Sequence, residues 1–224
     1  MTWRTQFHLS VTEAAKFTPG PRKMPWPMPG NLGGFREFEK YLDWQQFVIS
    51  FELRDGVPLN IRKGFERAQK LYLLAWIDFD LVPAADMTAL SALEFAFRDC
   101  YFSHIRDRRL DRANNSKIPA SKRKKRSSEE TILLSELLKY ALEHDGLSDN
   151  KIPIVARCGG SVIGLLNGDR RPSLADMRNS RAHGNPFENA AVPGLLEIVR
   201  DLIEYAYRGW IMSTRSPPAP TPDA

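Results

Sequence analysis

The spacing of apolar residues changes along this chain, and that change constrains the fold more than any other feature. Before about residue 62, apolar and polar residues alternate in short runs, which is typical of strands with one buried face. From Phe65 onward, large apolar residues recur every three or four positions, which is typical of helices that bury one face. The sequence therefore predicts a mainly α chain, with a small α+β element at 1–62 before a helical bundle at 63–212.

Local patterns predict the structure of the N-terminal element in more detail. Alternation over residues 3–11 predicts a half-buried strand, and alternation on both sides of the turn at Asp55 and Gly56 predicts a β-hairpin over residues 47–61. A short helix is predicted at 35–45, whereas the prolines of residues 19–29 favour a loop without regular structure. None of these patterns assigns a function to the element.

Helical spacing and capping residues divide the remainder of the chain. Ser127 with Glu130 predicts a helix start, Ser173 predicts another, and Pro193 suits the first turn of the last helix. The proline-rich residues 213–224 predict a disordered tail. The predicted helices span residues 64–80, 84–106, 127–146, 153–166, 173–183 and 193–210.

Positive charge is concentrated in one segment, residues 106–126. It holds ten Lys or Arg residues against two acids, a local balance of +8, so the rest of the chain sums to −3 within the overall +5. Such a run attracts phosphate backbones without regard to sequence, but it is equally typical of a solvated loop between helices. RNA contacts are predicted for its most basic stretch, which consists of Lys122, Arg123, Lys124, Lys125 and Arg126.

Several classes of protein are not indicated. No window approaches the roughly 18 consecutive apolar residues of a membrane span, and the N-terminus lacks the layout of a secretory signal, so we expect a cytoplasmic protein without a membrane partner. Cys100 and Cys158 belong to no cluster of metal ligands, and no glycine-rich phosphate loop is present. We therefore expect neither a metal nor a cofactor.

One stretch carries candidate chemistry, and it precedes Gly184. It reads Arg178-Asn179-Ser180-Arg181-Ala182-His183. The stretch resembles the HEPN superfamily, whose mark is often written R-N-x-x-A-H. Residues 92–98 are similar to the L-E-x-A-x-R signature of that family, and residues 137–147 resemble its helix-then-glycine segment. The resemblance covers about residues 64–210, although the stretch from Gly146 to Arg178 is long and contains an unusual glycine pair.

The resemblance implies an endoribonuclease of a homodimer, in which two such motifs face each other across a cleft. It further implies a role as a toxin in prokaryotic stress or phage defence, with an antitoxin or a nucleotidyltransferase as partner. The alternative within the family is a non-catalytic module for binding or dimerisation, such as the partner of a nucleotidyltransferase. The resemblance also implies that Glu94 and Arg98 lie near the motif and orient it.

The residue types suit RNA cleavage by the 2′-hydroxyl without a metal. A histidine such as His183 can move protons near neutral pH, and the fork of Arg178 matches two phosphate oxygens. The two differ by about 140° around an ideal helix, so one straight helix does not easily aim both at one phosphorus. A bent arginine, a loosened helix end or a second chain would solve this problem.

Less specific interpretations stay open for the same residues. Glu94 and Arg98 are four apart on a helix, which equally suits a surface ion pair. Asn179 shares a helix face with His183 and is a candidate supporting residue. Arg181 is a candidate for RNA contact, although a solvent-facing role suits it better. In a third interpretation Arg178 and His183 are purely structural.

Overall fold

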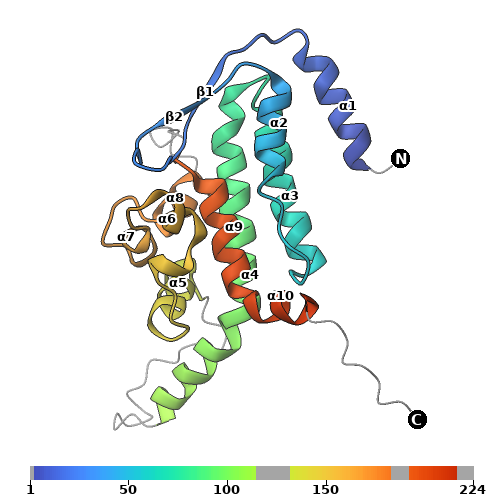
Figure 1. The fold of residues 1–224 in the computed structure, drawn as a ribbon. Helices are drawn as coiled ribbons and strands as arrows, with labels where there is room; N and C mark the ends of the chain where they lie inside the picture. Colours follow the sequence, from blue (N-terminus) through green and yellow to red (C-terminus); the bar gives the residue numbers. More distant parts are fainter. Residues whose placement is uncertain (1–2, 115–131, 183–191, 216–224) are drawn as a thin grey trace, which may run out of the picture.

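The computed structural model describes residues 3–114, 132–182 and 192–215, and it is mainly helical with one small antiparallel sheet near the N-terminus, as predicted (Figure 1). In chain order the elements are α1 (Trp3–Ala15), β1 (Arg22–Pro25), β2 (Phe35–Phe38), α2 (Tyr41–Ile49), α3 (Leu59–Leu74), the 3-10 turn η1 (Phe79–Leu81), α4 (Val82–Asn114), α5 (Leu134–Glu143), the 3-10 turn η3 (Asp149–Lys151), α6 (Pro153–Cys158), α7 (Ile163–Asn167), α8 (Leu174–Ala182), α9 (Leu195–Ala206) and α10 (Arg208–Arg215).

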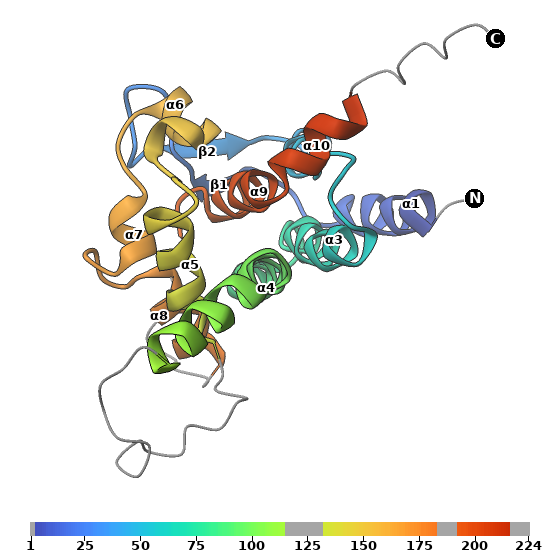
Figure 2. The ribbon, with the colours of Figure 1, turned by 90° about the horizontal axis from the view of Figure 1, so that it is seen from below.

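The long helix α4 is the central element of the bundle. It packs against α3, α5, α8 and α9, and Figure 1 shows α2, α3, α4 and α9 running alongside one another. Leu90, Leu93 and Phe97 of α4 are fully buried, which places one continuous apolar stripe in the core. Seen from below, α5 to α8 gather on one side of α4 and α1 lies on the other (Figure 2).

Two predictions for the N-terminal element are wrong. Residues 3–15 form a helix rather than a strand, and the segment predicted as a β-hairpin contains the end of α2, a turn and the start of α3. Trp44 and Phe47 of α2 are three positions apart and both buried, which is the spacing of residues on one face of a helix. A short alternating run fits either element, and packing against α3 selects the helix.

Strand β1 lies in the proline-rich segment for which no regular structure was expected, whereas β2 occupies the first residues of the helix predicted at 35–45, which begins only at Tyr41 as α2. Strands β1 and β2 pair antiparallel, with Arg22 opposite Phe38 and Pro25 opposite Phe35. The pair has only two strands, so proline at its end removes no hydrogen bond from an inner strand. The loop between the strands reaches α9, where the indole of Trp26 donates to Glu197 at 3.2 Å.

The later helices follow the predictions with local differences. The helix predicted at 153–166 is two short helices, because Gly159 adopts a φ of +81° and ends α6. The Ser173 cap is confirmed, since its Oγ accepts from the backbone of Asp176 while the Asp176 carboxylate accepts from the backbone of Ser173. Helix α10 continues to Arg215, so 213–215 are helical and the rest of the predicted tail lies outside the described residues.

The predicted start at Ser127 also lies outside the described residues, and α5 begins at Leu134. Within the described ranges, no helix combines the length and the apolar character needed to cross a membrane.

Helix α9 buries three acidic side chains, which bind other segments of the chain. Glu197, Asp201 and Glu204 are 1%, 2% and 4% exposed. Arg157 of α6 forms a two-point contact with Glu197, at 2.6 and 2.8 Å. The turn before α3 reaches Glu204, which accepts from the backbone and side chain of Arg54 at 3.0 and 2.6 Å. These contacts offset part of the cost of burying the charges.

The middle carboxyl of this set, that of Asp201, has its pKa raised to about 6. Burial is the largest cause of this increase, the neighbouring Glu197 and Glu204 also raise the pKa of Asp201, and Arg200 and the backbone N–H of Ile154 lower it. The carboxyl of Asp201 therefore takes up a proton at a pH at which an exposed aspartate is still ionised.

Replacing Asp201 by Asn should change how stability depends on pH. The folded protein holds the Asp201 proton up to about pH 6, whereas the unfolded chain releases it near pH 4, so the unfolded state binds fewer protons in this window. The free energy of unfolding of the wild type should therefore fall, relative to that of Asp201→Asn, by about 2 kcal/mol between pH 4 and 6.5. Urea unfolding across this range measures it.

The matched control is Asp107→Asn, since the side chain of Asp107 is 60% exposed. The free energy of unfolding of Asp107→Asn should change with pH in the same way as that of the wild type. Parallel curves for Asp201→Asn as well would show that this carboxyl titrates normally.

Candidate functional site

Helix α8 carries the Arg178 motif and is held against α4. Leu174, Ala175 and Met177 are buried, so these three residues fix which side of the helix meets the bundle. Arg178 comes next in the chain, and its side chain is 33% exposed at the α4 side of the helix. The Arg178 guanidinium thus lies at the edge of the core, where it has access to solvent.

The Glu94 carboxylate lies between two guanidinium groups. Its Oε2 is 2.8 Å from Nε of Arg178 on α8, and its Oε1 is 3.3 Å from Nη2 of Arg98 one turn along α4. The Glu94 side chain is only 15% exposed. Arg98 also donates to the backbone carbonyl of Ile132, at 2.9 Å, which connects the cluster to the segment before α5.

This cluster leaves part of the Arg178 guanidinium available. Its Nε is buried and meets the carboxylate as an ion pair without a well-directed hydrogen bond, and Nη1 contacts the Asn179 side chain at 3.3 Å. Within the described part of the chain, Nη2 has no protein partner. One carboxylate between two guanidiniums leaves a net charge of +1, and a planar donor with a free edge suits a phosphate oxygen.

The structure brings together the two stretches that carry most of the resemblance. Glu94 and Arg98 lie beside Arg178, so they are more than a surface pair within one helix. Whether they orient Arg178 for a reaction stays a prediction. Asn179 is exposed and contacts Arg178.

Other candidate residues lie outside the described residues. These are His183 and the basic stretch Lys122–Arg126, and the side chain of Arg181 is likewise not described. The meeting of Arg178 with His183 therefore stays a prediction.

The start of the basic segment differs from the expected inter-helix loop. Residues 106–114 belong to α4, and Arg109 holds the Glu136 carboxylate of α5 with two contacts of 2.6 Å. Arg108 lies 5.9 Å from the ring centre of Tyr140, a cation–π distance. Part of the basic segment thus serves to pack α5 on α4.

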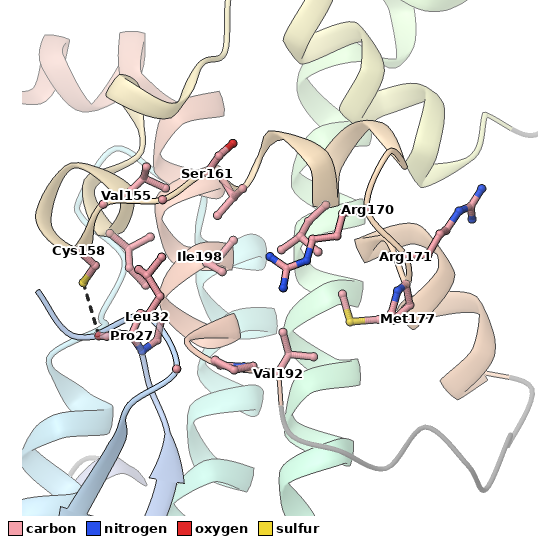
Figure 3. A pocket seen from close by; sticks show the side chains of 18 residues that line it. Pro27, Leu32, Val155, Cys158, Ser161, Arg170, Arg171, Met177, Val192 and Ile198 are labelled. Carbon is pink, nitrogen blue, oxygen red and sulfur yellow. Dashed lines mark hydrogen bonds between the residues drawn. The ribbon is translucent and has the colours of Figure 1, made fainter. Parts of the chain in front are cut away.

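Sequence reasoning missed a cavity of about 630 Å³ that lies beside the start of α8 (Figure 3). Met177 lines it, whereas its neighbour Arg178 does not. Arg170 also lines the cavity. The glycine pair at 159–160, which also lines it, was noted in the sequence as unusual, but its place in a cavity wall depends on the fold.

Among the described residues, no group of three or more His, Cys, Asp or Glu side chains is arranged to hold a metal ion.

Comparisons of this chain with protein-family models, with curated proteins and with solved structures found no match. The HEPN resemblance therefore depends on the motifs themselves and on the Glu94–Arg178 contact.

A double-mutant cycle on Glu94 and Arg178 measures how strongly the two helices are coupled. Glu94→Gln removes the charge and keeps the shape, which leaves two guanidiniums without their shared carboxylate. Because Glu94 is largely buried, the coupling free energy from urea unfolding of Glu94→Gln, Arg178→Gln and the double variant should be about 1–2 kcal/mol.

Lys139 and Glu143 provide the control cycle, since they form an exposed pair four residues apart on α5. Their coupling should stay below about 0.5 kcal/mol. Equal coupling in both cycles would mean that the Glu94–Arg178 contact adds no more than a surface pair.

Proposed function

We propose that this chain is a metal-independent RNA endonuclease in which Arg178 and His183 act on one phosphodiester. The observation that supports the proposal is the 2.8 Å contact between Glu94 and Arg178. It joins two stretches 84 positions apart that each resemble a HEPN motif. The one-third exposure of Arg178 leaves its outer edge accessible to a substrate.

The reaction is a transesterification within the RNA. The 2′-oxygen attacks the adjacent phosphorus and loses its proton to a base, while the bond from phosphorus to the 5′-oxygen breaks. The products are a 2′,3′-cyclic phosphate and a 5′-hydroxyl, with a proton delivered to the leaving oxygen by the His183 imidazolium. Arg178 stabilises the charge that develops on the non-bridging oxygens.

Two copies of the chain supply what one copy lacks. A single His183 cannot act as base and acid in the same step, whereas two facing motifs provide one imidazole for each task. A dimer also removes the difficulty that Arg178 and His183 project about 140° apart on one helix. The basic residues 106–126 would draw RNA towards this composite site in a salt-dependent way.

A second candidate function has one observation in its favour. Glu94 already neutralises one guanidinium of the cluster, as expected if Arg178 fastens α8 to α4 in a non-catalytic module. Such a module would bind a partner, for example a nucleotidyltransferase, or a second copy.

Cleavage of RNA in the presence of EDTA distinguishes the two functions. The wild type should release fragments ending in 2′,3′-cyclic phosphate, and Arg178→Ala and His183→Ala should each lose at least about a hundredfold in rate. Arg171→Ala is the matched control, because Arg171 pairs with Asp176 on the surface of the same helix start and should retain activity. Loss of activity in EDTA, or activity kept in both variants, contradicts the nuclease proposal.

Mixing the wild type with an excess of His183→Ala tests the composite site. A heterodimer of the two holds one imidazole where the reaction needs two, so cleavage in co-refolded mixtures should fall more steeply than the share of wild-type chain. Activity that stays proportional to the share of wild-type chain, in a mixture shown by sedimentation to contain heterodimers, argues against a shared site.

A further inference from the structure

The cavity beside α8 is built by segments far apart in the sequence. Pro27 and Leu32 come from the loop between β1 and β2, Cys158 and Val162 from the connection of α6 to α7, and Ile198 from α9 (Figure 3). At about 630 Å³, the volume falls in the range of sites for small organic ligands.

Its walls are mostly apolar. Ile154, Val155, Met177 and Ile198 are otherwise buried residues of the core that face this space, and Leu32 at its rim is 48% exposed. Water in contact with such a wall is released when an apolar group takes its place, so the cavity favours a ligand with an apolar body.

Close backbone approaches hold the walls in place without a ligand. A Cβ on Gly160 would lie 2.8 Å from Cδ1 of Leu32, and one on Gly194 would lie 2.8 Å from Cδ of Pro27. Both glycines adopt positive φ values, of +82° and +70°, which side-chain-bearing residues rarely accept. The side chains of Leu32 and Pro27 in the β1–β2 loop therefore pack directly on the two connections that form the opposite wall.

Two arginines line the cavity, Arg170 and Arg171, and they differ in where their guanidinium groups point. Figure 3 shows its guanidinium directed into the space between the apolar walls, whereas Arg171 points away. Arg171 is paired with Asp176. In the described ranges no carboxylate or other acceptor binds the Arg170 side chain, so its donors face the cavity without a protein partner. A guanidinium above an apolar wall binds a carboxylate, sulfonate or phosphate.

We propose that this cavity binds a small amphipathic anion. The acidic head contacts Arg170, and the aliphatic or aromatic body lies against Leu32, Val155 and Met177. The site is separate from the Glu94–Arg178 cluster, so the proposal does not depend on nuclease activity.

The test uses 8-anilinonaphthalene-1-sulfonate, an anion with an aromatic body that fluoresces in apolar surroundings. Titration of the wild type should show one saturable site per chain. Arg170→Gln should weaken binding about tenfold or more, the loss expected for one charge-assisted hydrogen bond. Arg171→Gln, the neighbouring control, should change the dissociation constant less than about twofold.

Further variants and competitors separate the head from the body of the ligand. Leu32→Glu brings a negative charge to the rim and should weaken binding of the dye as strongly as Arg170→Gln. Leu42→Glu is its control, because Leu42 is an exposed leucine on α2, and it should have no effect. Decanoate and decyl phosphate should displace the dye, and decanol should compete at least tenfold less well. Whichever of the two anions displaces the dye at lower concentration identifies the preferred head group.

Equal affinities for Arg170→Gln and Arg171→Gln would overturn the proposal, and so would dye binding that never saturates in a protein that still unfolds cooperatively. Unfolding in urea confirms that each variant retains the fold. The RNA cleavage assay has no bearing on these outcomes, so this proposal and the nuclease proposal fail independently.

Discussion

Three buried carboxylates on α9 bind the β1–β2 loop, α6 and the turn before α3, and the positions of these segments depend on them. Glu197 binds Trp26 and Arg157, Asp201 accepts the first free N–H of α6, and Glu204 binds the turn before α3. Hydrophobic packing has little directional preference, whereas these contacts specify which atom of each segment meets α9. Burying these carboxylates costs desolvation free energy, and their contacts hold the β1–β2 loop and α6 in one defined position.

The helical part of the fold could be predicted because its apolar spacing extends over many turns. Helices α3, α4, α5, α8 and α9 all appear near their predicted positions. The N-terminal element could not, because runs of four or five alternating residues fit a strand or a helix equally well, and Phe47 lies in a helix that packs against α3. Strand β1 was missed because prolines surround it, which local rules assign to loops, and β2 was missed because its residues were assigned to the helix that begins only at Tyr41.

The two candidate sites differ in how much of them the sequence could reveal. Arg178, Glu94 and Arg98 were found because two recognisable motifs contain them, although only the fold shows that one carboxylate spans two helices. Arg170 carried no such signal. Its environment is assembled from three distant connections, and a charged residue next to a turn looks the same in sequence whether it faces water or a cavity.

Adjacent residues of α8 belong to different sites, since Met177 lines the cavity and Arg178 contacts Glu94. A short helix moves as a rigid unit, so a molecule that pressed on the thioether of Met177 would also displace the neighbouring guanidinium. Thermodynamic linkage makes such an effect reciprocal, because whatever holds the guanidinium in one position changes the affinity of the cavity by the same factor. The two proposed sites would thus share one turn of α8.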